Sequence, residues 1–434
     1  MMKYATLTPL WIVLAAVVCA SGMWLYANRV LVPYQIAQAA AHHQPRGNSS
    51  DLYPRWVGAR ELLLNHRDPY SIEVTREIQA GFYGRILPPD QPGRTENYQQ
   101  GFYYPVYVAF GLAPTLNIPF ESVRRAFFWV LAGVTVISVY LWLWLIGWRL
   151  ALWEQAAVLV LTFGSLPVMH GLKLQQITLL VIPLIAAAMV LLALERQFAA
   201  GILLAVATIK PQLVFLVLLW LVIWTLADWR RRCRWAGAFL LSMALLWAAS
   251  EWYLPHWVSQ FWQAIREYHS YTGEMSVTRM LVGRASVAVE LAALVILTAI
   301  CWRGRREAAN AGCFALVVSL TLAVTCLVVP SYGPYNQILL LPALLTIIKE
   351  RRTIWRKDAV NRVLLIITIG LVGWPWISSV ALAGLSFVLP AEVVEKGSSL
   401  PFWTSLQTPL GVAAGILAYS LGRTFAGSQE ASTS

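Results

Sequence analysis

The sequence predicts an all-α, polytopic integral membrane protein, a bundle of about 11–13 transmembrane helices with a large first outer loop. Of the 434 residues, 58% are hydrophobic and only 12% are charged, which is about half the charged fraction of soluble domains. Apolar stretches of about 20 residues, enough to cross a membrane as a helix, recur from Leu7 to Leu421. The stretches are continuously apolar and do not alternate, so they are not the strands of a membrane barrel.

The positive charge is arranged as in a membrane protein. The formal net charge is +12, and the excess of arginine and lysine lies in short clusters between apolar stretches, at 230–234, 303–306 and 349–357. Loops rich in Lys and Arg stay in the cytoplasm. We therefore expect these clusters and both termini to be cytoplasmic, and the protein to lie in the cytoplasmic (inner) cell membrane. The same pattern excludes a nucleic-acid-binding stripe.

A single membrane domain, 1–434, is predicted from the order of the apolar stretches. The first stretch is longer than the core of a signal peptide, which favours an uncleaved first helix. Lys210-Pro211 interrupts a stretch that is too long for one span, because proline removes a backbone donor. The predicted parts are a first span at 7–27, an outer loop at 28–124, spans in 125–254 with a break at 210–211, a second outer loop at 255–285, the remaining spans in 286–422 and a polar tail at 427–434.

Both outer loops contain apolar pieces that are not expected to cross the membrane. Segment 102–119 contains three prolines, which disrupt a regular helix, so it is predicted to be re-entrant or interfacial. In the second outer loop, Trp257, Phe261, Trp262 and Ile265 recur at helical spacing. This pattern predicts a helix that lies flat on the membrane interface.

With this topology, polar residues from distant parts of the chain fall on the outer face. Such groups near the ends of spans are costly unless they pair or face water, so their convergence favours a shared cavity. The residues are Asp51, Asp68, Lys173, Gln175, Gln176, Lys210, Gln212, Arg279, Arg284, Tyr335, Asn336 and Gln337.

Asp51 allows two interpretations. An acid near the membrane face can act as a general base that takes a proton from an acceptor hydroxyl. Alternatively, Asp51 caps the helix that follows it, together with Ser49 and Ser50. Asp68 stands directly before a proline and is predicted to be a turn residue.

The cationic residues also have two interpretations. Lys210 lies at the helix break, where a buried ammonium needs an anion: a phosphate, or a carboxylate such as Asp51 or Glu251. Arg279 and Arg284 can bind the same phosphate. Alternatively, each of these side chains extends to the lipid headgroups.

Amide side chains complete the candidate set. Gln175, Gln176 and residues 335–337 can hydrogen-bond sugar hydroxyls, or they can fasten helices together. His269 is predicted to be an exposed interfacial ring, and neither the His nor the Cys residues have metal-ligand spacing. No metal and no other cofactor is therefore expected.

Five short pieces in a fixed order resemble the polyprenyl-phosphate-sugar-dependent glycosyltransferases of family 87, which have the GT-C membrane architecture. The joint order carries the resemblance, because each piece is short. The pieces are Asp51-Leu52-Tyr53 with Ala59 to Leu64 and Asp68-Pro69-Tyr70; Phe102-Tyr103-Tyr104-Pro105 and Pro114; Lys173-Leu174-Gln175-Gln176; Ala200-Gly201-Ile202 through Ile209-Lys210-Pro211-Gln212; and Tyr335-Asn336-Gln337 with Leu339-Leu340-Leu341-Pro342.

This resemblance implies an inverting transfer of a hexose, commonly mannose, from a polyprenyl-phosphate carrier to a lipid or glycan acceptor at the outer face. The essential acid of such enzymes maps to Asp51, and Tyr104 joins the candidate substrate-binding residues. The chain departs from the family at Leu174-Gln175-Gln176-Ile177, where members often have Gly-Gln-x-Asn. It also has Pro105 alone where members have paired prolines.

The resulting hypothesis is a direct displacement. Asp51 would deprotonate the acceptor, Lys210 with Arg279 or Arg284 would hold the leaving phosphate, and Gln175 or Gln176 would orient the sugar. The expected partners are the lipid-linked donor, the acceptor and the bilayer, with no nucleic acid. The alternatives are a transporter or flippase for lipid-linked sugars, which a broken helix also suits, and a non-catalytic scaffold, which needs no cavity.

Overall fold

The computed structural model describes residues 7–43, 46–47, 50–87, 100–273, 275–330 and 333–430, and all the regular structure in these ranges is helical. This confirms the predicted all-α class. The longest helices are α1 (Leu7–Tyr26), α6 (Phe120–Ile146), α12 (Trp229–Tyr253), α15 (Ser286–Gly304), α18 (Ala359–Leu385) and α21 (Thr408–Glu430).

The remaining helices are of two kinds. Those packed among the long helices are α7 (Leu152–Phe163), α8 (Leu166–Leu174), α9 (Thr178–Ala193), α10 (Gln197–Ala207), α11 (Pro211–Leu226), α16 (Gly312–Val328) and α17 (Leu341–Lys357). The others are α2 (Val32–Ala41), α3 (Leu52–Asn65), α4 (Ile72–Tyr83), α5 (Val108–Leu112), α13 (Trp257–Thr272), α14 (Val277–Val282), α19 (Ala391–Glu395), α20 (Leu400–Ser405) and the short turns η1 (Ala27–Leu31), η2 (Ala113–Thr115), η3 (Gly283–Ala285) and η4 (Pro334–Leu340).

Several of these helices are long and apolar enough to cross a membrane. Five meet this criterion among the described residues, and α7 with α8, bent by 56°, form a sixth if the pair is one broken span. The helices α9, α10, α11 and α16 are apolar but shorter. The chain is therefore a polytopic membrane protein, and the number of crossings stays a prediction.

Helix α16 forms the centre of the bundle. Every residue from 314 to 327 is buried, as expected for a helix that is apolar on all sides. Its buried hydroxyl groups are satisfied locally, because Ser319, Thr321 and Thr325 each donate to the carbonyl four residues earlier, at 2.8 Å. The helix can therefore sit in an apolar interior without polar partners on its neighbours.

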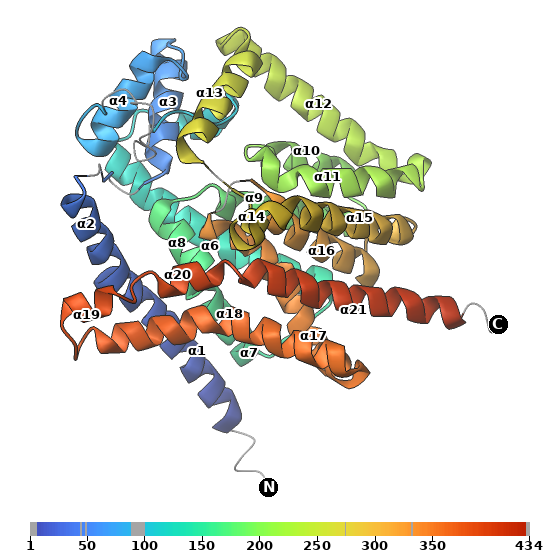
Figure 1. The fold of residues 1–434 in the computed structure, drawn as a ribbon. Helices are drawn as coiled ribbons and strands as arrows, with labels where there is room; N and C mark the ends of the chain where they lie inside the picture. The colour runs from blue at the N-terminus through green and yellow to red at the C-terminus, as the bar shows by residue number, and fades with distance from the viewer. Residues whose placement is uncertain are drawn as a thin grey trace.

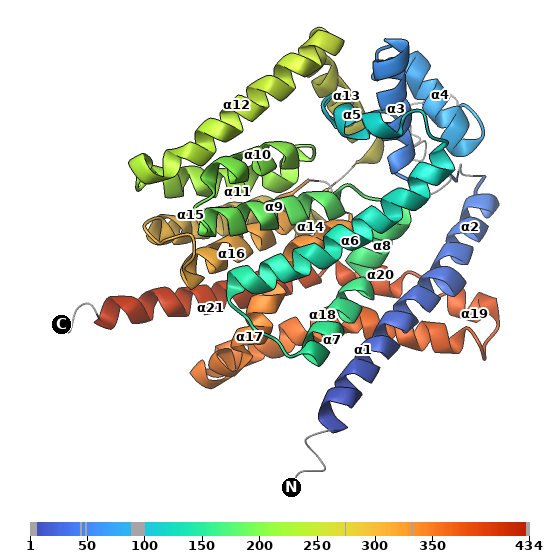
Figure 2. The ribbon, with the colours of Figure 1, turned by 180° about the vertical axis from the view of Figure 1, so that it is seen from behind.

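One end of the molecule is built from short helices. Helices α3, α4, α5 and α13 gather there, away from both termini (Figures 1 and 2). Aromatic rings join α13 to the segment before α6, with ring centroids 5.9 Å apart for Tyr107 and Trp257 and 4.8 Å apart for Tyr103 and Tyr268. The helix predicted from Trp257, Phe261, Trp262 and Ile265 is present as α13, and its place at the membrane interface stays a prediction. One of its faces rests on protein, and Trp262 on the other side is 58% exposed.

Two of the three basic clusters meet at the end of α12 that lies away from α13 (Figure 1). Arg232 at the start of α12 donates to the carbonyls of Arg305 and Arg306 beyond α15. Lys349 on α17 donates to the carbonyl of Ile146 at the end of α6, at 2.8 Å. The short helices and these basic residues thus lie at different ends of the molecule, and which end faces the cytoplasm stays a prediction.

The first helix is longer than the predicted span at 7–27. It continues through η1 and α2, so that Pro9–Ala41 is one 33-residue helix. Pro33 would normally interrupt it, but the preceding turn, η1, is π-helical and accommodates the missing backbone donor. Similarly, α21 extends into the predicted polar tail as far as Glu430, and residues 431–434 lie outside the described residues.

Candidate active site

Asp51 is held at the start of α3 by contacts with the α8–α9 connection. Its backbone N–H donates to the carbonyl of Leu174, at 2.9 Å, and its carboxylate accepts a hydrogen bond from the Gln176 amide nitrogen. Gln175 adopts the left-handed conformation, with φ of 55°, which turns the chain so that Gln176 faces Asp51. The Asp51 side chain makes no capping hydrogen bond. Ser49, which was also predicted to cap this helix, lies outside the described residues.

The electrostatic environment of Asp51 suits a base. Burial raises the pKa of its carboxyl group, whereas the positive charges of Arg55 and Lys210 and the Gln176 hydrogen bond act in the opposite direction. A carboxylate with a raised pKa accepts protons more readily than an exposed one. The cations and the hydrogen bond favour the ionised form, which is the form that accepts a proton. A general base needs both properties.

Lys210 lies where α10 and α11 are interrupted. The residue is 4% exposed, and its ammonium donates to Thr178 Oγ1 at 2.8 Å and to Asn336 Oδ1 at 3.3 Å. It also lies 4.9 Å from the centre of the Tyr335 ring. The residue before a proline is excluded from helical geometry, and Lys210 has φ of −131°. The helix break therefore turns this side chain towards α9 and η4.

Residues 176–178 join Asp51 and Lys210 into one site. Gln176 holds the Asp51 carboxylate, and Thr178, two residues later, holds the Lys210 ammonium. The Gln176 side-chain oxygen is buried and has no hydrogen-bond partner among the described residues. It is available as an acceptor for a hydroxyl group of a ligand. The predicted meeting of Asp51, Gln176, Lys210 and Asn336 in one place thus appears in the structure.

Arg55 belongs to this cluster, although the sequence analysis missed it. Its guanidinium donates to the Asp51 carbonyl and to the Tyr104 hydroxyl and stacks 4.2 Å above the centre of the Tyr104 ring. Tyr104 was a predicted site residue, and it lies at the edge of the cluster. The spacing of Asp51 and Arg55, four residues apart at the start of a helix, could have indicated their proximity.

His170 was also missed. Its ring stacks on Tyr335, with centroids 5.8 Å apart and an interplanar angle of 24°, and Lys210 contacts the same tyrosine. The Nδ1 atom of His170 is buried without a hydrogen-bond partner in the described structure. A single histidine in the apolar helix α8 was the available signal.

Three of the predicted residues fasten segments together. Gln175 accepts from Ser50 and donates to the carbonyl of Arg124, at 2.5 Å. Gln337 donates to the carbonyl of Ser405, at 2.9 Å, and Lys173 donates to the side-chain oxygen of Asn28. For Gln175 and Gln337 this is the helix-fastening role predicted as the alternative for amides.

Other candidates lie outside the cluster. Arg279 and Arg284 are exposed, and Gln212 is half-buried in the first turn of α11. None of these three side chains takes part in the hydrogen bonds that hold Asp51 and Lys210. Asp68 accepts from the backbone N–H of Tyr70 at 2.8 Å, which confirms its turn role. Glu251 accepts from the backbone N–H of His256 at 2.7 Å, rather than pairing with Lys210.

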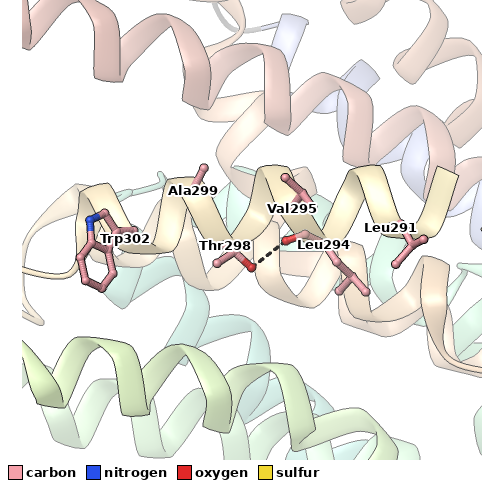
Figure 3. Close-up of a pocket in the computed structure, with 6 residues that line it drawn as sticks. All are labelled: Leu291, Leu294, Val295, Thr298, Ala299 and Trp302. Carbon is pink, nitrogen blue, oxygen red and sulfur yellow. Dashed lines mark hydrogen bonds between the residues drawn. The ribbon is translucent and has the colours of Figure 1, made fainter. Parts of the chain in front are cut away.

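The hollow in Figure 3 is not part of this site. It is a shallow groove along one face of α15, lined by Leu291, Leu294, Val295, Thr298, Ala299 and Trp302. The Thr298 hydroxyl donates to the carbonyl of Leu294, at 2.8 Å, so the face offers a ligand little polarity. Nor do the described residues contain a group of three or more His, Cys, Asp and Glu side chains that could hold a metal ion.

The fold and the site define a polytopic membrane protein with a buried polar cluster near the end formed by the short helices. Comparison with known families identifies its class: the profile of glycosyltransferase family 87 matches residues 102–330, slightly more than half of the chain. The chain belongs to glycosyltransferase family 87 and is a membrane glycosyltransferase. Asp51 and Arg55 precede the matched range, whereas Gln176, Lys210 and Tyr104 lie within it. No curated protein and no solved structure matches the chain.

Proposed function

We propose that the protein transfers a hexose, in the first instance mannose, from a polyprenyl-phosphate carrier to a lipid or glycan acceptor at the outer face of the cytoplasmic membrane. The observation that carries the proposal is the joining of Asp51 and Lys210 by residues 176–178. It puts a carboxylate and an ammonium in one buried site, one for the acceptor and one for the donor phosphate.

The proposed reaction is a single displacement that inverts the anomeric carbon. Asp51 takes the proton of the acceptor hydroxyl as its oxygen attacks the anomeric carbon. The bond between that carbon and the phosphate oxygen breaks, and its electron pair leaves with the polyprenyl phosphate. Lys210 stabilises the charge that develops on the leaving phosphate. This is electrostatic stabilisation by a preorganised cation, and the mechanism requires no metal or other cofactor.

The polar groups around Lys210 are proposed to bind the sugar. Thr178 and Asn336 form a hydrogen bond with one another at 3.0 Å, and both contact the ammonium. Gln176 adds its unpartnered oxygen. Hydroxyl and amide groups of this kind suit the hydroxyls of a hexose. The stacked rings of Tyr335 and His170 border the same cluster.

Reconstitution tests the proposal. Purified protein in liposomes is supplied with radiolabelled polyprenyl-phosphate mannose, a second lipid-linked hexose and a panel of lipid and glycan acceptors. The expected product is an acceptor that carries the label with inverted anomeric configuration. If the label crosses the bilayer but reaches no acceptor in the panel, the protein is a transporter of lipid-linked sugars instead.

A further inference from the structure

Arg55 is a buried cation that shares the single negative charge of Asp51 with Lys210 and forms no ion pair in the described structure. Its side chain is 5% exposed, and its described contacts are two neutral oxygens and an aromatic ring. None of the ion pairs among the described residues includes it. A buried charge is costly unless an opposite charge or a full set of hydrogen bonds compensates it. An anionic ligand would supply that compensation.

The other arginines of the same region show the contrast. Arg60 on α3 lies 3.4 Å from the Glu61 carboxylate, and Arg67 pairs with Glu61 at 3.1 Å and with Glu77 at 2.7 Å. Both are about 40% exposed. The more buried arginine is thus the one without an ion pair. Its Nε–H is also buried without a hydrogen-bond partner in the described structure, which leaves a donor for a ligand.

We infer that Arg55 is the second cation of the donor site and binds, together with Lys210, the phosphate of the lipid-linked sugar. The inference rests on the proposed function and assigns a residue to its phosphate subsite. Guanidinium groups bind phosphate oxygens through several parallel N–H donors, which gives both charge and orientation. Stacking on Tyr104 fixes the plane of the guanidinium before the donor arrives.

Charge balance supports two cations in this site. The donor is a phosphodiester with one negative charge, and the ionised Asp51 carries another, so Arg55 and Lys210 together make the loaded site neutral. In the reaction Asp51 gains the acceptor proton and becomes neutral, while the leaving polyprenyl phosphate acquires a second negative charge. The total stays at zero. A buried site that stays neutral avoids the large cost of an uncompensated charge.

The position of Arg55 also sets it apart from the arginines of the second outer loop. Arg279 and Arg284 are exposed, whereas Arg55 donates to the backbone of Asp51 itself. The segment that carries Arg279 is anchored elsewhere, because Ser276 donates to the Glu290 carboxylate at 2.6 Å. Of these three arginines, only Arg55 has a side chain that forms a described hydrogen bond with a residue of the site.

Direct binding tests the inference without turnover. A fluorescent short-chain polyprenyl monophosphate and the matching uncharged polyprenol are titrated into the detergent-purified full chain. Arg55→Gln is compared with Arg60→Gln, on the same helix, and with the double variant Arg279→Gln, Arg284→Gln. We expect Arg55→Gln to weaken phosphate binding about 10–100-fold, as for loss of a charge-assisted contact. Its polyprenol affinity and the affinities of the other two variants should stay within about 2-fold of wild type.

Each other outcome overturns the inference in a recognisable way. Equal losses for phosphate and polyprenol would mean that Arg55 only supports the fold. A loss confined to the Arg279 and Arg284 double variant would move the phosphate subsite to the second outer loop and leave the proposed function intact. If the wild-type protein binds the two lipids equally well, both the inference and the lipid-phosphate donor of the proposed function fail.

Arg55→Lys, which keeps the charge, should retain more phosphate affinity than Arg55→Gln.

Discussion

At the scale of single residues, Asp51 and Lys210 acquire their properties from the same three-residue connection. Gln176 presents a donor to the carboxylate, and Thr178 presents a hydroxyl to the ammonium. Each charged group is thereby held by neutral groups, without a direct ion pair between the two in the described structure. A direct ion pair between the base and the cation would have to break before a substrate could engage both groups.

The pH dependence of transfer follows from the environment of Asp51. Burial raises the pKa of this carboxyl group above its ordinary value of 3.8, and a base works only when it is ionised. We therefore expect kcat/KM to fall as the pH is lowered through this raised pKa, at a higher pH than for an exposed aspartate. A kcat/KM profile from about pH 4 to about pH 9 measures it.

Gln176→Leu provides the matched variant for this profile. The Gln176 hydrogen bond lowers the pKa of Asp51, so its loss should move the acidic limb to still higher pH. A wild-type limb at or below the ordinary pKa of aspartate would contradict the role of Asp51. An unchanged limb in Gln176→Leu would show that this amide does not act on the base.

The sequence predicts part of this residue-scale picture. Asp51, Gln176, Lys210 and Asn336 are predicted correctly to meet, because polar residues at the ends of spans stand out against an apolar background. Arg55 was not recognised, since its environment depends on the distant Tyr104. The left-handed turn at Gln175 directs Gln175 and Gln176 to different partners, and residue spacing alone does not reveal it.

At the scale of elements, two interruptions shape the site. The left-handed residue between α8 and α9 turns Gln176 towards Asp51, and the break before Pro211 turns Lys210 inward. The break was predicted from proline, and the structure confirms it between α10 and α11. The continuation of the first helix to Ala41 was not predicted, because it depends on the π-helical turn η1, which has no simple sequence signature.

Close packing of α10 on α12 supports the break at Lys210. A Cβ atom on Gly201 would lie 2.2 Å from the carbonyl oxygen of Trp235 and 2.8 Å from the Ala238 side chain. We expect Gly201→Ala to separate these helices and lower the free energy of unfolding by about 1–3 kcal/mol, and to lower transfer because α10 leads directly into the break at Lys210. Thermal unfolding in detergent measures the first effect, and the transfer assay measures the second.

Gly237→Ala is the control for this helix contact. Gly237 lies on α12, and a Cβ atom there would meet nothing within 4 Å. Alanine is the better helix former, so this substitution should leave stability unchanged or raise it by up to about 1 kcal/mol. If Gly201→Ala proves as harmless as Gly237→Ala, the close packing of α10 on α12 is not a requirement of the fold.

At the scale of the whole molecule, short helices and basic clusters lie at opposite ends (Figure 1). Composition and the positions of Lys and Arg were sufficient to predict this separation, because the bilayer imposes it on any sequence of this kind. The packing of α13 against Tyr103 and Tyr107 is a tertiary contact that the local sequence pattern does not reveal. The amphipathic pattern of that helix suits a protein surface as well as a membrane surface.

Cysteine labelling tests the predicted orientation. In a variant without the five native cysteines, a single cysteine is placed at exposed Glu73 on α4 or at exposed Arg356 on α17. In intact cells, a membrane-impermeant maleimide should label Glu73→Cys, and it should label Arg356→Cys only after the membrane is permeabilised. Labelling of Arg356→Cys alone in intact cells would invert the topology and move the site to the cytoplasmic face.

The central claim is that Asp51 is the base of a sugar transfer, and single-turnover transfer by Asp51→Asn tests it most directly. We expect the rate to fall about 10²–10⁴-fold, with donor affinity within a few-fold of wild type. Because burial raises the Asp51 pKa, the Asp51 carboxyl group stabilises the fold only while it is protonated, at low pH. This contribution is lost as the pH rises through that pKa. The melting temperature of Asp51→Asn at neutral pH should therefore equal or exceed that of the wild type. Transfer at a near-wild-type rate by a folded, donor-binding Asp51→Asn protein would contradict the claim.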